Sequence, residues 1–88
     1  MTRYWFEFDI PLVDAHNLPS GLLIGCGITA YNYEDAISIL KDKVFKEQVI
    51  PVIKRMIENV DIRTLDQGHV IPNMTPPVAR GVWFPYAY

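Results

Sequence analysis

Residues 22–45 read LLIGCGITAYNYEDAISILKDKVF, and this stretch decides the fold. Its first part is apolar, rich in β-branched residues and interrupted by glycines, which is typical of a buried strand. Because the apolar run over residues 21–30 is nearly continuous, the sequence predicts a central strand that is covered on both faces.

A helix is predicted after this strand, over residues 33–46. Asn32 is a favourable N-cap residue. Asp35, three residues later, occupies the position of a capping box whose side chain accepts a hydrogen bond from the backbone of the cap. Glu34 and Asp35 also suit the positive end of the helix dipole. The apolar residues that follow fall in a stripe about 100° wide, at positions 33, 36, 37, 40 and 44.

The N-terminal residues 3–10 alternate between apolar and polar side chains, which indicates a half-buried antiparallel strand. Trp5 is the exception, because it is a large aromatic residue on the polar face. Two interpretations remain open for it: a loop covers its ring, or the ring anchors an interface. Residues 11–20 form a connection rich in turn residues, in which Asp14 and His16 are expected to be an exposed pair.

The second half of the chain is less regular. Residues 49–60 carry an apolar stripe at helical spacing and are predicted as a second helix, with a strand over residues 53–62 as the alternative. Residues 62–77 contain a turn signal and three prolines, so we expect irregular structure there. A last strand is predicted over residues 78–84, followed by an aromatic tail that we expect to be docked.

Residues 1–88 therefore form one α+β domain, expected as two layers. A small antiparallel sheet of three or four strands is packed by one or two helices. The single cysteine favours a reducing compartment, and we expect a soluble, cytoplasmic protein. A net charge of −2 argues against nucleic-acid binding, which needs a basic face. No apolar run is long enough to span a membrane.

No motif in the sequence dictates a chemistry. Gly25-x-Gly27-x-x-Ala30 has the letters of a dinucleotide-binding turn, but the helix cap comes too late, at Asn32, so no cofactor is expected. Cys26 is interpreted as a small buried side chain, because nothing places a base such as His69 beside it. Asp66 and His69 are expected to stabilise a turn, since no third metal ligand is evident.

Five residues are the candidates for binding, and no residue is predicted to be catalytic or to ligate a metal. These candidates are His69, Asn73, Arg80, Trp83 and Trp5. Four of them, all except Trp5, come from the irregular stretch and the last strand, where binding sites are often built. Arg80 is expected to pair with a carboxylate, either of this chain or of a partner.

The segment over residues 25–36, GCGITAYNYEDA, resembles the strand-to-helix junction of HicB-type antitoxin domains. In that junction a Gly-Cys and a Thr precede a capped helix that opens with acidic residues and Ala. The resemblance implies an antitoxin-like role in binding a protein. The second amphipathic segment and the proline-rich return depart from that family.

Two functions are therefore weighed. The first is a small non-catalytic protein-interaction module, such as a regulator, an immunity-like or an antitoxin-like protein, with a protein partner or a second copy as its target. Small size, acidic charge and surplus aromatic residues favour it. The second is a ligand-binding or enzymatic domain with a pocket under residues 65–77. That hypothesis predicts His69, Asn73 and Arg80 in one pocket.

Overall fold

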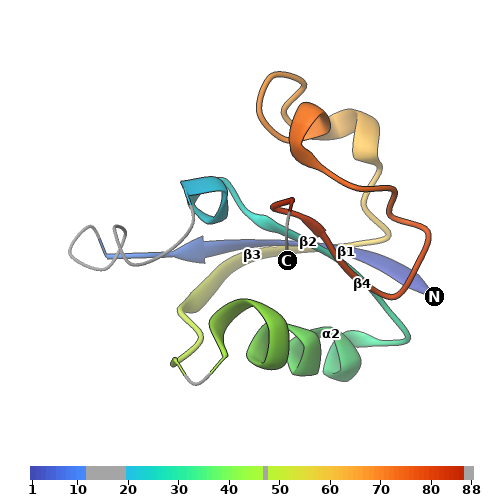
Figure 1. Ribbon diagram of the computed structural model, residues 1–88. Helices are drawn as coiled ribbons and strands as arrows, with labels where there is room; N and C mark the ends of the chain where they lie inside the picture. The colour runs from blue at the N-terminus through green and yellow to red at the C-terminus, as the bar shows by residue number, and fades with distance from the viewer. Residues whose placement is uncertain (12–19, 47, 87–88) are drawn as a thin grey trace.

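The computed structural model describes residues 1–11, 20–46 and 48–86. Four strands form one antiparallel sheet in the order β3-β1-β2-β4. They are β1 (Thr2–Asp9), β2 (Cys26–Ala30), β3 (Val52–Glu58) and β4 (Gly81–Phe84). The sheet lies between a helical layer and an irregular lobe, residues 60–77, which is drawn in orange (Figure 1). The predicted α+β class with a small antiparallel sheet is confirmed.

The predicted helix is present and begins where its cap was expected. It consists of α2 (Tyr33–Ile39), which continues as a π-helix, η2 (Leu40–Phe45). The Asp35 backbone N–H donates to the Asn32 side-chain oxygen at 2.8 Å, and the Tyr31 backbone N–H donates to the Asp35 carboxylate at 3.0 Å. These bonds satisfy backbone donors that the first turn leaves free. The segment connects β2 to β3. It crosses β1, because β1 lies between these two strands in the sheet and is antiparallel to both.

The helix predicted over residues 49–60 is wrong, because this region contains β3. Its register along β1 shifts between Glu7 and Phe8, so Lys54 is an extra residue in a β-bulge. Ile53 and Met56 therefore lie opposite Phe8 and Phe6, on the same face, although they are three residues apart. The bulge thus produces in a strand the spacing that otherwise indicates a helix.

Two other strands are shorter than predicted. Residues 20–23 form a 3-10 helix, η1 (Ser20–Leu23), and β2 begins only at Cys26. The last strand begins at Gly81, whose φ of 138° is a conformation that side chains disfavour. In the lobe, two further 3-10 helices, η3 (Ile62–Thr64) and η4 (Ile71–Asn73), break the irregular path.

A separate core lies on each face of the sheet. On the helical face, the aromatic side chains of β1 pack with Ala36, Leu40 and Phe45 of the helical segment. On the opposite face, Trp5 and Trp83 pack with Val60, Leu65 and Val70 of the lobe. Every residue of β2 is buried, so both faces of this strand are covered, as the apolar run over residues 21–30 predicts.

The second core depends on two glycines. A Cβ atom on Gly25 would lie 2.3 Å from the Trp5 ring, and one on Gly27 would lie 2.4 Å from the Trp83 ring. The two indole rings stack with centroids 6.0 Å apart. The Gly25-x-Gly27 pattern therefore makes room for two tryptophans.

Substituting Gly27→Ala should destabilise the fold by about 1–3 kcal/mol, because the new methyl group overlaps the Trp83 ring. Urea unfolding followed by tryptophan fluorescence measures this change. Gly68→Ala is the matched control. Among the described residues, a Cβ atom on Gly68 would meet only the Asp66 Oδ1, at the ordinary contact distance of 3.4 Å. The control should shift the free energy of unfolding by less than about 1 kcal/mol. Equal effects of the two substitutions would contradict the packing described.

Candidate functional site

The structure separates the five candidate residues into three places. Trp5 and Trp83 are buried under the lobe, with 2% and 1% of their surface exposed, so a loop covers Trp5 and its ring is not at an interface. The Trp5 indole N–H donates to the Glu7 carboxylate at 2.9 Å. The Trp83 indole N–H is buried and has no acceptor among the described residues.

Arg80 forms an ion pair with Asp35 at the start of the helix. Its Nε donates to the Asp35 Oδ2 at 2.9 Å, and its guanidinium lies 5.8 Å from the centre of the Tyr31 ring. The hydrogen bond from Arg80, followed by the one from the Tyr31 backbone, lowers the pKa of Asp35 to about 2. Arg80, which precedes β4, therefore binds the first turn of the helix. It does not line the pocket that His69 and Asn73 share.

Asp66 and His69 form a local pair in the lobe. The Asp66 Oδ1 accepts the backbone N–H groups of Gly68 and His69, at 2.8 and 3.0 Å. Its Oδ2 lies 3.1 Å from the His69 Nδ1. The bond from Gly68, followed by the one from the His69 ring, lowers the pKa of Asp66. This is the turn-stabilising role expected from the sequence.

His69 and Asn73 come together at a pocket of about 510 Å³. The Asn73 side-chain N–H group donates to the His69 carbonyl at 2.8 Å, and the Asn73 carbonyl accepts the Tyr86 backbone N–H at 3.0 Å. The lobe and the end of β4 thus both contribute to the walls. The pocket is lined by Gly21, Ile24, His69, Asn73, Phe84, Pro85 and Tyr86.

The aromatic tail is only partly described. The Tyr86 backbone is held by Asn73, but 68% of the residue is exposed, and residues 87–88 lie outside the described part. Asp14 and His16 also lie outside it. The expected docking of the tail therefore stays a prediction for residues 87–88.

Cys26, the single cysteine of the chain, lies apart from His69. Cys26 is buried in the core on the helical face, and burial raises the pKa of its thiol. A buried, protonated thiol is a poor nucleophile. Within residues 1–11, 20–46 and 48–86, no three His, Cys, Asp or Glu side chains gather in a way that could hold a metal ion.

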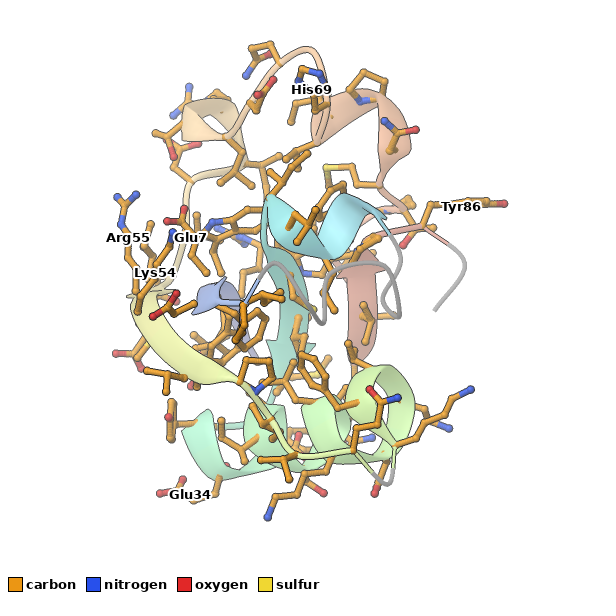
Figure 2. All side chains as sticks on the ribbon, turned by 90° about the vertical axis from the view of Figure 1, so that its left-hand side faces the viewer. Glu7, Glu34, Lys54, Arg55, His69 and Tyr86 are labelled. Atoms are coloured by element: carbon orange, nitrogen blue, oxygen red, sulfur yellow. The ribbon has the colours of Figure 1, made fainter. Side chains whose placement is uncertain are left out.

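A surface that the sequence reasoning missed lies along β3. This strand ends the sheet, and no described segment pairs with its outer edge. Val52 and Met56 are exposed there, at 71% and 38%, next to the exposed Lys54 and Arg55. Figure 2 shows Lys54, Arg55 and Glu7 together at this side of the sheet. The β-branched run around Pro51 was the sequence signal for an edge strand.

No family model, curated protein or solved structure matches this chain. The likeness of residues 25–36 to the HicB-type junction therefore stays a prediction. Among the described residues, none of the helices has the length and apolar character needed to cross a membrane.

The Asp35–Arg80 pair predicts a pH dependence. Since the folded state lowers the pKa of Asp35 from an ordinary value of ~3.9, its contribution to stability is complete above about pH 4 and is lost as the pH falls towards 2. Carboxyl NMR titration of native Asp35 should give a midpoint about pH 2. Arg80→Ala should move that midpoint towards ~3.9.

Arg63→Ala is the control for this titration, because it breaks a separate ion pair with Asp61, in which Nη2 and Oδ2 are 2.9 Å apart. The Asp35 midpoint should not change in this variant. A native Asp35 that titrates near its ordinary pKa would show that the pair with Arg80 does not form in solution.

Proposed function

We propose that this chain is a non-catalytic protein-interaction module that binds an extended acidic segment of a partner protein along the outer edge of β3. The observation that carries the proposal is this edge strand, which ends the sheet and exposes apolar side chains. An edge strand presents unpaired backbone N–H and C=O groups, and an extended peptide can pair with them.

The two edges of the sheet differ in a way that favours β3. On the outer side of β4, the Thr75 backbone N–H donates to the Trp83 carbonyl at 2.9 Å. The lobe is also held to β2, where the Thr29 hydroxyl donates to the Pro77 carbonyl at 2.7 Å. The lobe thus occupies part of the β4 edge. β3 is longer than β4 and has no such cover among the described residues.

Charge identifies the class of partner. Lys54 has no carboxylate within ion-pair distance among the described residues, and the Arg55 Nη1 lies 3.5 Å from the Glu7 Oε2. The Glu7 Oε2 is also the acceptor for the Trp5 indole N–H. Lys54 therefore remains available for an acidic side chain of an added strand, and the apolar side chains of that strand would lie beside Met56, on the face of the sheet that carries Phe6.

A second copy of the chain fits this edge less well. In an antiparallel pairing about the middle of β3, Arg55 of one copy would face Arg55 of the other, and like charges on adjacent strands repel. The bulge at Lys54 also interrupts regular pairing. Bulges and lysines are devices that protect edge strands from self-association.

A cytoplasmic location is part of the proposal. The free, buried thiol of Cys26 supports it, because a reducing compartment keeps such a thiol reduced. The interaction needs no catalytic group, which agrees with the separate positions of Cys26 and His69 in the fold.

A fluorescein-labelled peptide that alternates valine with glutamate is the direct probe. Its fluorescence anisotropy should rise on titration with the protein, and a matched peptide with lysine in place of glutamate should bind more weakly. Lys54→Glu should weaken binding of the acidic peptide about fivefold, because an attractive charge pair becomes repulsive. Lys41→Glu, an exposed change on the helical layer, is the matched control and should leave binding unchanged.

Two results would overturn this proposal. One is a lack of charge discrimination: the acidic and the basic peptides bind equally, or Lys54→Glu and Lys41→Glu weaken binding equally. The other is a molecular mass that doubles with concentration in sedimentation while the amide hydrogens of β3 become protected from exchange. That second result would assign the edge to a second copy of the chain.

A further inference from the structure

The pocket beside His69 carries an inference that is independent of the β3 edge. His69 and Tyr86 lie away from Lys54 and Arg55 in Figure 2, so the two surfaces are separate. The pocket volume of about 510 Å³ is in the range of small-ligand sites. Ile24, Phe84, Pro85 and Tyr86 give it mainly apolar walls, which suit a flat apolar group.

The polar groups of the pocket are set as hydrogen-bond acceptors. The Asp66 carboxylate lies against the His69 Nδ1, so the neutral imidazole holds its proton on Nδ1 and leaves Nε2 as an acceptor. One of the two N–H donors of the Asn73 side-chain amide is used by the His69 carbonyl. The remaining Asn73 amide oxygen is a second acceptor, and no described bond uses it.

The absence of basic side chains from the pocket lining argues against an anionic ligand. The residues that line the pocket include no lysine and no arginine. Arg80, the cation expected there from the sequence, is held by Asp35 at the helix cap. A carboxylate or phosphate in the pocket would lack a fixed cation and would face two acceptors, whereas an N–H group finds partners.

We infer that this pocket binds a planar aromatic ring that carries an N–H donor, of which indole is the simplest member. The ring lies against Ile24, Pro85 and Tyr86, and its N–H donates to the His69 Nε2 or to the Asn73 amide oxygen. Tryptophan side chains of a peptide and free aromatic metabolites share this chemistry.

Titration of ¹⁵N-labelled protein with indole tests the inference. Indole should shift the backbone resonances of Gly21, Asn73 and Tyr86, and 1-methylindole should bind about tenfold more weakly, since it keeps the ring but lacks the donor. N-acetyl-tryptophanamide separates the two sources: binding tighter than that of indole assigns a peptide side chain, and weaker binding assigns a free molecule.

Tyr86→Ala should weaken indole binding, while Tyr31→Ala, which removes an equally exposed tyrosine at the helix cap, should not. Equal affinities for indole and 1-methylindole would overturn the inference, as would shifts confined to residues outside the pocket. The acidic-peptide affinity should be unchanged in Tyr86→Ala, so failure of this inference and failure of the proposed function can be told apart.

Discussion

The contact of two indole rings with two glycines joins the first and last strands to β2 and to the lobe. Trp5 comes from the first strand and Trp83 from the last, and the glycines that admit them flank Cys26 at the start of β2. The rings give the irregular lobe an apolar surface on which Val60, Leu65 and Val70 are buried. The Trp83 indole N–H is buried in this core and has no acceptor among the described residues, an arrangement that costs stability.

Closing both faces of the sheet determines where function can lie. The helical segment covers one face and the lobe covers the other, which leaves the sheet edges and the seams between layers (Figure 1). The lobe meets β4 through Thr75, so, among the described residues, the longer edge without a pairing segment is that of β3. The pocket beside His69 is a seam, formed where the lobe meets η1 and the end of β4. The proposed interaction edge and the proposed ligand pocket thus follow from the same packing.

The sequence predicted the parts whose signals are local. The first strand, the Asn32 cap and the helix follow from alternation, capping and an apolar stripe, all within short windows. The β3 bulge defeated this reasoning, because an extra residue changes the period of a strand. His69 and Asn73 share a pocket because they are four residues apart around η4. Arg80 is absent from it because its partner, Asp35, is 45 residues away, a pairing that no local pattern contains.

The proton chemical shifts of Gly25 and Gly27 test the central claim most directly. If the indole rings lie against these glycines, ring currents should displace their Hα resonances from ordinary glycine values, and Trp5→Leu and Trp83→Leu should each return one of them. Gly68, which has no indole ring within 4 Å of the position a Cβ atom would take, serves as an internal reference. Ordinary shifts for Gly25 and Gly27, equal to those of Gly68, would contradict the packing on which the lobe, the free edge and the pocket all depend.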